Sequence, residues 1–404
     1  MALDEPSAQL NAELQSAVQD ALASRRPLIH HLNADTSWLL QIPRPNNAVK
    51  WGARFYYNIL IDPWLRGGQS DVGKWFSEQR HATESAIQSI KELEELIQRN
   101  EALTESLRPE PGSRRNTGSE EHLGVEEQLI DAVAVSHEFT DHCHKETLLE
   151  IHPDVPVFAI KEAAKLIESW RHFRTVTTVN SFGVGGDTDW RSTSLPPLPE
   201  WIGISRLLQV DDVLNYHAAL MITFNNRHGN AQSKLAKTNG YMKNGTSKRH
   251  HSAIEPNEDE ETAEAIVYTP HGMHSGDLAL IPEAQPSITT LAFLHGLHNV
   301  RVGTASGKTA LQSNLGAHNG LKAQRILNAN YWIGTHDEIK KGGGLVAWFL
   351  YRDELTLKDA LDQERKSRQD GDKGMAKGEL GEVLDSFNDT NWCDLRNGES
   401  KVLL

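Results

Sequence analysis

Apolar and polar residues alternate along the chain in blocks that predict a layered α/β protein. Residues 7–25 and 80–105 place apolar side chains at helical spacing, which is typical of amphipathic helices. The run Phe55–Ile61 instead alternates as a strand does and ends at an Asp-Pro turn signal. Short strands and helices then follow one another without a repeat of fixed period. This mixture predicts sheets that are covered by helices.

The same patterns predict the remaining elements. Strands are expected within 37–64 and at 131–135, 156–160, 175–179, 199–204, 216–224, 265–268, 289–294 and 331–336. Helices are expected at 161–173, 315–327 and 355–365, with a further helix starting at 145–150. Two polar segments interrupt the pattern, a loop at 107–121 and an insertion at 227–262. We therefore expect an N-terminal helical extension (1–36), a central α/β domain (37–352) and a charged, helical C-terminal tail (353–404).

The composition narrows the class of partner and the compartment. The chain has 404 residues and a formal charge of −14, so no basic surface favours a nucleic-acid partner. Two cysteines far apart in sequence argue against a disulfide scaffold and fit a reducing compartment. Neither a secretory leader nor an apolar run of membrane-spanning length is visible. We expect a cytoplasmic protein with no membrane partner, the nucleus being the alternative; the oligomeric state stays open.

A polar loop after the strand at 131–135 carries the densest chemistry in the chain. It contains His137, Asp141 and His142, which offer the nitrogen and oxygen donors that transition metals bind. The alternative is a loop whose histidines cap the following helix or bond locally. His144 is better interpreted as a first-turn helix residue, and Cys143 as a packed thiol.

Histidines also follow several other predicted strands. His271, His295 and His336 each come at a strand end, whereas His217 precedes a strand. A layered fold gathers strand ends along one sheet edge, where ligands usually bind. Any one of these histidines alone is more often a hydrogen-bonded structural residue than a ligand. Their joint pattern predicts a metal site.

These motifs resemble the metallo-β-lactamase superfamily over about residues 37–352. Its H-x-H-x-D-H signature is matched by the segment His137–His142, and its early I-L-I-D-P strand by Asn58–Pro63. A helix, a strand and a last histidine follow at 317–336. The resemblance implies a four-layer αβ/βα sandwich with an N-terminal helix and loop insertions. It also implies a bound metal, usually zinc, and hydrolysis of an ester, lactone, amide, thioester or phosphodiester.

The chain departs from that family at two positions. Phe139 replaces the second histidine of the signature, and no carboxylate stands near Tyr268–Gly272, where a metal-bridging aspartate is expected. The resemblance therefore implies a changed ligand set with one or two zinc ions, iron or manganese being alternatives. Its candidate ligands are His137, Asp141, His142, His217, His271 and His336, with His295 and His298 as replacements.

A mechanism follows if such a metal binds. The cation would lower the pKa of a bound water and polarise the scissile oxygen. Asp141 would hold or deprotonate that water, and His271 or His298 would protonate the leaving group. Asp62 and Asp337 would orient ligand imidazoles. Asp62 also has a plain interpretation as a turn residue before Pro63.

Three functional classes stay open from the sequence. The first is a metal-dependent hydrolase of a small-molecule substrate. The second is a degenerate member that binds a ligand or partner without catalysis, and the third is an iron-dependent oxidoreductase on the same scaffold. Two weaker motifs are set aside: Lys340–Gly344 is better explained as a hairpin turn than as an anion contact, and Gly303–Thr309 is one residue short of a P-loop.

Overall fold

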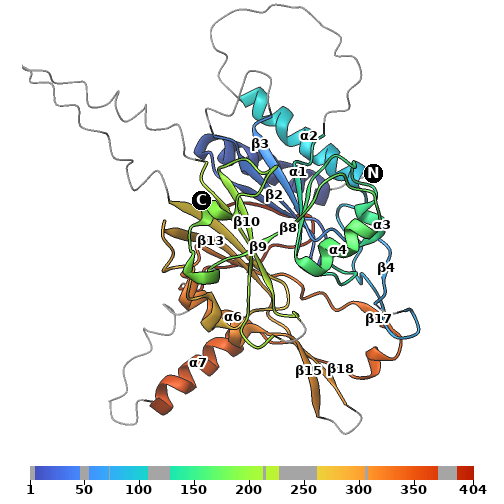
Figure 1. The fold of residues 1–404 in the computed structure, drawn as a ribbon, viewed down its shortest axis with the longest axis vertical. Coiled ribbons are helices and arrows are strands. Elements are labelled where there is room, and N and C mark those ends of the chain that lie inside the picture. Colours follow the sequence, from blue (N-terminus) through green and yellow to red (C-terminus); the bar gives the residue numbers. More distant parts are fainter. Residues whose placement is uncertain are drawn as a thin grey trace, which may run out of the picture.

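Two β-sheets pack face to face, and helices cover their outer faces (Figure 1). The computed structural model describes residues 5–45, 54–71, 73–107, 128–212, 215–226, 262–304, 308–371 and 389–404. The predicted loop at 107–121 and the predicted insertion at 227–262 lie almost entirely outside these residues. The described layers form the predicted αβ/βα sandwich.

The first sheet combines an antiparallel half with a parallel half. Its order is β20 (Ser400–Val402), β1 (Leu28–His31), β2 (Trp38–Pro43), β3 (Tyr56–Ile61), β6 (Ala132–Val135), β7 (Val157–Ala159) and β8 (Val176–Thr178). Strands β20 to β3 pair antiparallel, and β3 to β8 pair parallel. The parallel pairing of β3 with β6 brings the loops that follow these two strands side by side.

The second sheet is built in the same mixed way. Its order is β19 (Trp392–Cys393), β16 (Tyr331–Ile333), β13 (Ile288–His295), β12 (Ala263–Thr269), β11 (Ala219–Phe224), β10 (Ile202–Leu207) and β9 (Asn180–Ser181). Strands β12, β13, β16 and β19 run parallel, so the residues that follow them emerge at one edge. Antiparallel β10 and β11 are the paired strands that the sequence predicted.

The helices lie on the outer faces. Helices α1 (Glu5–Ser24), α2 (Ile90–Leu107), α3 (Lys145–Leu148) and α4 (Lys161–Ser169) belong to the first sheet's side, and α6 (Ala317–Leu327) and α7 (Leu357–Gly371) to the second. The helix predicted from residue 80 begins only at Ile90. The backbone N–H groups of Ala82 and Thr83 donate to the Glu338 carboxylate at 2.8 and 3.0 Å, which holds this stretch in a non-helical path.

Short elements complete the chain. Two three-stranded sheets contain β14 (Asn299–Gly303), β15 (Thr309–Asn314) and β18 (Leu350–Asp353), and β4 (Gly68–Gln69), β5 (Glu78–Arg80) and β17 (Lys341–Gly343). The 3-10 turns are η1 (Val184–Gly186), η2 (Trp190–Thr193), η4 (Ser275–Leu278) and η5 (Val346–Trp348). The hairpin turn predicted at 340–344 is wrong, because residues 341–343 form strand β17 paired with β5. Residues 303 and 309 lie on paired strands β14 and β15 rather than in a strand-to-helix phosphate loop.

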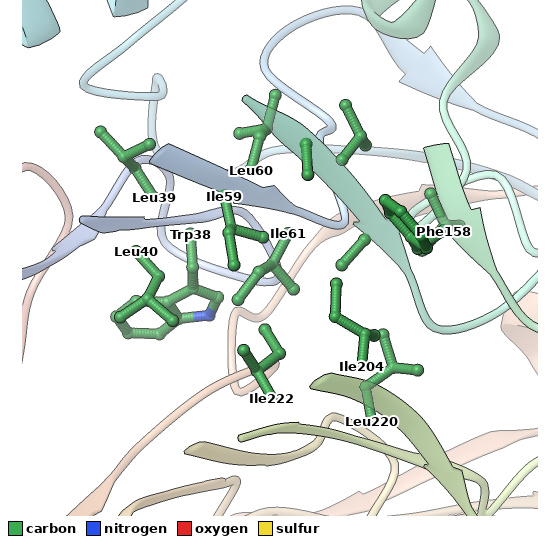
Figure 2. Close-up of a cluster of buried hydrophobic side chains, with 14 of the residues drawn as sticks. Trp38, Leu39, Leu40, Ile59, Leu60, Ile61, Phe158, Ile204, Leu220 and Ile222 are labelled. Atoms are coloured by element: carbon green, nitrogen blue, oxygen red, sulfur yellow. The ribbon is translucent and has the colours of Figure 1, made fainter. Parts of the chain in front are cut away.

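The core lies between the two sheets. Ile59 and Ile61 of β3 point towards Ile222 of β11, whereas Leu60 points to the outer, helix-covered face (Figure 2). All of these side chains are fully buried. Sheets covered on both faces carry unbroken apolar runs, as β3 does. Each such side chain contributes roughly 1.5–3 kcal/mol on burial, so the strand ends beside the site rest on a rigid base.

The sheets extend past the predicted central domain. Strand β1 lies in the segment assigned to the N-terminal extension, and β19 and β20 lie in the segment assigned to the C-terminal tail. The division into three parts stays a prediction. Among the described residues, no helix has both the length and the apolar character to cross a bilayer.

Candidate metal centre

His142 lies in the loop after β6, and Asp62 at the end of β3 holds its ring. Asp62 has a left-handed backbone (φ 42°), which turns its carboxylate towards the neighbouring strand. One oxygen, Oδ1, accepts from the Ser136 backbone N–H at 2.7 Å. The other, Oδ2, accepts from the Ser136 hydroxyl and from His142 Nδ1 at 2.7 Å. With Nδ1–H donated to a carboxylate, His142 Nε2 carries the lone pair that can bind a metal. These contacts match the orienting role predicted for Asp62.

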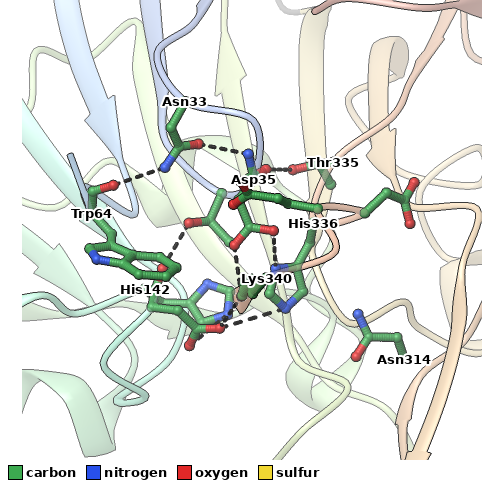
Figure 3. Close-up of polar contacts among 12 residues, drawn as sticks. Asn33, Asp35, Trp64, His142, Asn314, Thr335, His336 and Lys340 are labelled. Atoms are coloured by element: carbon green, nitrogen blue, oxygen red, sulfur yellow. Dashed lines mark hydrogen bonds and ion pairs between the residues drawn. The ribbon is translucent and has the colours of Figure 1, made fainter. Parts of the chain in front are cut away.

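His336 follows β16 and is held in the same way by a different carboxylate. Its Nδ1 lies 3.0 Å from Asp35 Oδ1, and its backbone N–H donates to the Asp35 carbonyl at 2.9 Å. The Asn33 side chain fixes this turn by accepting from the Asp35 backbone N–H at 2.9 Å (Figure 3). Asp35 was not among the predicted residues, because it occupies a polar turn between β1 and β2 and carries no strand-end signal.

His271 follows β12 and faces His142. Its Nδ1 lies 3.3 Å from Asn314 Oδ1, an acceptor, so the ring presents Nε2 inward. The two Nε2 atoms of His271 and His142 are only 3.0 Å apart. The ring centroids of His271, His142 and His336 are mutually 4.9, 4.9 and 5.1 Å apart. Two imidazole lone pairs facing each other repel unless a proton or a cation lies between them, and this geometry is typical of a metal site.

His137, at the end of β6, is packed against the same cluster. Its ring centroid lies 5.0 Å from that of His142 and 4.8 Å from that of His271. Its Nδ1 is 2.8 Å from the Ser136 hydroxyl, and its Nε2 is 3.0 Å from the Tyr216 carbonyl oxygen. Both ring nitrogens of His137 therefore have partners outside the cluster of imidazoles, whereas Nε2 of His142 faces the imidazole of His271.

Two groups of three buried side chains bring their donor atoms within 4.8 Å of one another in the described part of the chain: His137, His142 and His271, and Asp141, His142 and His336. Asp141 Oδ1 lies 3.7 Å from His142 Nε2, and Asp141 Oδ2 lies 3.8 Å from His336 Nε2. Ligands bonded to one ion at about 2.0–2.2 Å are separated by distances of this order. The donor sets therefore fit a transition metal.

Lys340, for which an anion contact was the less favoured of two sequence interpretations, points into the centre and contacts two carboxylates of the protein. Its Nζ lies 2.8 Å from Asp141 Oδ2 and 2.8 Å from Asp35 Oδ2. It also lies 5.2 Å from the centroid of the Trp64 ring, a cation–π distance. The lysine thus joins the carboxylate that supports His336 to a candidate ligand (Figure 3).

Burial and charge set the protonation of these groups. Burial acts to raise the pKa of Asp141, but Lys340 and the surrounding histidines outweigh it and hold that pKa well below the usual value. Burial and neighbouring imidazoles lower the pKa of His271 well below the usual value. Burial also lowers the pKa of His336. Neutral imidazoles and an ionised carboxylate are the metal-binding forms.

Burial acts to lower the pKa of His142 as well, yet the carboxylates of Asp141 and Asp62 raise it above the usual value. The same two carboxylates that favour an imidazolium at this position favour a metal cation there.

The chain is similar to known proteins in structure but not in sequence. No model of a known protein family matches the chain, and neither does any curated protein sequence. Among solved structures, it is similar to a possible metal-dependent hydrolase from Veillonella parvula (10% identity, TM-score 0.46, covering 94% of this chain and 100% of that one). It is also similar to isothiocyanate hydrolase from Delia radicum gut bacteria (11%, TM-score 0.44, 93% and 99%). A third is CmlA, a diiron beta-hydroxylase from Streptomyces venezuelae (12%, TM-score 0.38, 89% and 60%).

The arrangement of layers and loops settles the fold. Two mixed seven-stranded sheets face each other, helices lie outside, and candidate ligands follow β6, β12 and β16. The chain has the metallo-β-lactamase fold. Within this fold, Phe139 at the second signature position stacks on His137 (5.8 Å between centroids) and packs on Tyr216 (4.7 Å). An aromatic cluster therefore fills the place of that ligand.

The metallo-β-lactamase fold does not bring every predicted residue into the two groups. His217 Nδ1 is 3.1 Å from the Gly272 carbonyl oxygen, and the residue belongs to neither group. His298 also lies outside them, with its Nδ1 3.0 Å from the Arg352 guanidinium. His295 is buried beside Phe293, with ring centroids 5.1 Å apart, and its Nδ1 contacts the Thr269 hydroxyl at 3.0 Å. Its role in the structure is packing.

Three neighbouring residues have structural roles. Asp337 accepts from the backbone N–H groups of Leu297 and His298 at 2.6 and 2.8 Å, so it fixes a loop and does not orient a grouped imidazole. His144 is the N-cap of α3 and accepts from the Thr147 backbone N–H, as the helix-start interpretation predicted. Cys143 is buried in the hydrophobic core, as the packed-thiol interpretation predicted.

A cavity of about 430 Å³ lies apart from the centre. Residues of α1, β1, α2 and the C-terminal segment line it, including His31 and Arg99. No member of the two donor groups is among its lining residues. This cavity therefore says nothing about the substrate of the metal centre.

Proposed function

We propose that this protein is a metal-dependent hydrolase that acts on a small molecule with an ester, lactone, amide or phosphodiester bond. The observation that carries the proposal is the pair of Nε2 atoms of His142 and His271, 3.0 Å apart. Each ring has its Nδ1 beside a fixed acceptor, Asp62 or Asn314, so both lone pairs point at one place. Holding two lone pairs together costs energy that a bound cation recovers.

Zinc is the ion that the donor chemistry favours, with iron or manganese as alternatives. Three nitrogen or oxygen ligands with a position left for water are the usual arrangement of catalytic zinc sites. When bound, the metal would supply a Lewis acid for the scissile group and lower the pKa of a water. Either donor group would provide such a set of three.

The chain's own residues would then orient the reactants. Asp35 and Asp62 hold His336 and His142 in the tautomer that leaves Nε2 free. Lys340 keeps Asp141 ionised, and the low pKa of this carboxyl makes it a weak base. Asp141 is therefore better suited to orient a water by hydrogen bonding than to deprotonate it. Since His271 is used as a ligand, His298 is left as the candidate proton donor to the leaving group.

A non-catalytic binding protein is the second candidate. Phe139 favours it, because an aromatic cluster occupies the position of one family ligand. An iron-dependent oxidoreductase has no comparable support among the described residues. The two free cysteines and the acidic composition support a cytoplasmic protein without a nucleic-acid partner.

Metal analysis separates the hydrolase from the binding protein. We expect protein purified without chelators to contain about one metal ion per chain, and His142→Ala to lower this several-fold, because His142 belongs to both groups. Less than about a tenth of an ion per wild-type chain would favour the binding protein. Esters, lactones and phosphodiesters with chromogenic leaving groups, assayed with and without added zinc, would then define the substrate class.

A further inference from the structure

The two donor groups share His142, and this limits how many ions the centre can hold. The Nδ1 of His142 is committed to Asp62, so only Nε2 is available for a metal. An imidazole nitrogen has one lone pair and binds one ion at a time. The groups His137–His142–His271 and Asp141–His142–His336 therefore cannot both be complete together.

The shortest donor separation belongs to the pair His142 and His271 of the first group. Two nitrogens bonded to one zinc at about 2.05 Å and at a tetrahedral angle lie roughly 3.3 Å apart. The Nε2 atoms of His142 and His271 are already 3.0 Å apart. The donor atoms of the other group are wider, with 3.7 Å between Asp141 Oδ1 and His142 Nε2.

The ammonium of Lys340 already lies beside the second group, Asp141–His142–His336. Lys340 Nζ contacts Asp141 Oδ2 and Asp35 Oδ2, each at 2.8 Å, and is almost completely buried. An ion bound by Asp141 and His336 would have to share Asp141 with this ammonium. Two positive charges at such short range repel strongly where water is excluded.

The buried charges balance for one divalent ion. Three carboxylates with little or no exposure contact the grouped histidines or Lys340: Asp35, Asp62 and Asp141. Lys340 supplies one positive charge, and one divalent ion supplies the other two. A second divalent ion would leave the buried centre with excess positive charge, which is costly unless paired.

We propose that Lys340 takes the place of a second metal ion, so that the chain binds a single divalent ion through His137, His142 and His271. The inference rests on the proposed metal-dependent function and specifies its site. Lys340 holds Asp141 and Asp35 in place as a fixed metal ion would. It thereby prevents a metal ion from binding to the Asp141–His142–His336 group. To bind the ion, His137 gives up one of its contacts with Ser136 or Tyr216.

Metal stoichiometry tests the proposal directly. Metal-free wild type, Lys340→Met and the matched control Lys341→Met, which removes an exposed neighbouring lysine, are dialysed against increasing Zn²⁺ and analysed by elemental mass spectrometry. We expect wild type and Lys341→Met to saturate at one ion per chain and Lys340→Met to take up additional zinc. A merely structural lysine would not raise the metal content on removal. Two ions in wild type, or no gain in a folded Lys340→Met, would overturn the proposal.

Single ligand variants keep the test decisive if Lys340→Met does not fold. We expect His137→Ala to lose zinc several-fold, whereas Asp141→Asn and His336→Ala keep the single ion. The reverse pattern would place the ion in the other group and overturn the proposal. Absence of zinc from wild type at saturation would instead refute the metal-dependent function itself, so the two failures are distinguishable.

Discussion

Asp62→Asn is the substitution that most directly tests whether the centre is preorganised for metal. The aspartate accepts from the Ser136 N–H on Oδ1 and from His142 Nδ1 and the Ser136 hydroxyl on Oδ2. Asparagine has the same shape but only one acceptor oxygen. If that oxygen keeps the Ser136 N–H, the amide NH₂ faces His142 Nδ1. The imidazole must then accept at Nδ1 and carry its proton on Nε2, which is the wrong tautomer for a ligand.

The size of the effect follows from the lost support. Removing a carboxylate that orients a ligand histidine typically weakens metal affinity by about 10–100-fold, which corresponds to roughly 1.4–2.7 kcal/mol. His142 is fully buried, so no water replaces the lost acceptor. We therefore expect the upper part of this range.

Competition with a chromophoric zinc chelator would measure the affinity, and circular dichroism would show whether the variant is folded. Asp187→Asn, an exposed carboxylate outside both donor groups, is the control and should leave the affinity unchanged. A folded Asp62→Asn variant that binds zinc within about threefold of wild type would refute the argument that Asp62 fixes the tautomer.

Four further outcomes are expected. His144→Ala should lower the free energy of unfolding by about 1 kcal/mol through loss of the α3 N-cap, with metal content unchanged; a drop in metal would contradict the capping role. Burial lowers the pKa of His30 to about 4, so the folded protein favours the neutral ring. The contribution of this ring to the free energy of unfolding is therefore complete above pH 6.5 and is lost as pH falls towards 4. Between pH 7 and pH 4, the free energy of unfolding measured in urea should fall by up to about 3 kcal/mol more for wild type than for His30→Gln. An equal fall in both proteins would refute this. Ile222→Ala should cost about 2–5 kcal/mol by denaturant unfolding, against less than about 0.5 for the exposed Val184→Ala. Chelation should lower the melting temperature but leave the far-ultraviolet spectrum unchanged; unfolding on chelation would make the metal structural.

Several of the predicted histidines converge because parallel strands bring the residues that follow them to one edge. His142, His271 and His336 follow β6, β12 and β16 and converge as expected. The same reasoning failed for His295, because side chains alternate between the faces of a strand. His295 shares a face with Phe293, which packs towards α6, whereas Leu294 faces the other sheet. The sequence alone does not fix which face turns to the site.

Local sequence did not point to Asp35 at all, and it offered an anion contact at Lys340 only as the less favoured alternative to a hairpin turn. Asp35 contacts His336 across 301 positions of the chain, and Lys340 contacts Asp141 across 199. Asp35 lies in a polar turn, where an aspartate is ordinary, and Lys340 precedes a glycine run that is typical of a hairpin. Their roles arise only when the two sheets pack. His217 shows a related effect: antiparallel β11 brings it to the same edge, but its Nδ1 lies beside the Gly272 carbonyl, and its role as a ligand stays a prediction.

The position of Lys340 also explains how this centre can form before any metal arrives. Asp35 and Asp141 are both buried, and two unpaired carboxylates in an apolar interior would oppose folding. Lys340 pairs with both, so the chain can fold with Asp35 already holding His336. Asp62 holds His142 through contacts that likewise involve only protein groups. The intersheet core stabilises the fold and the ammonium stabilises the carboxylates, so a metal ion would meet histidines whose tautomers are already set.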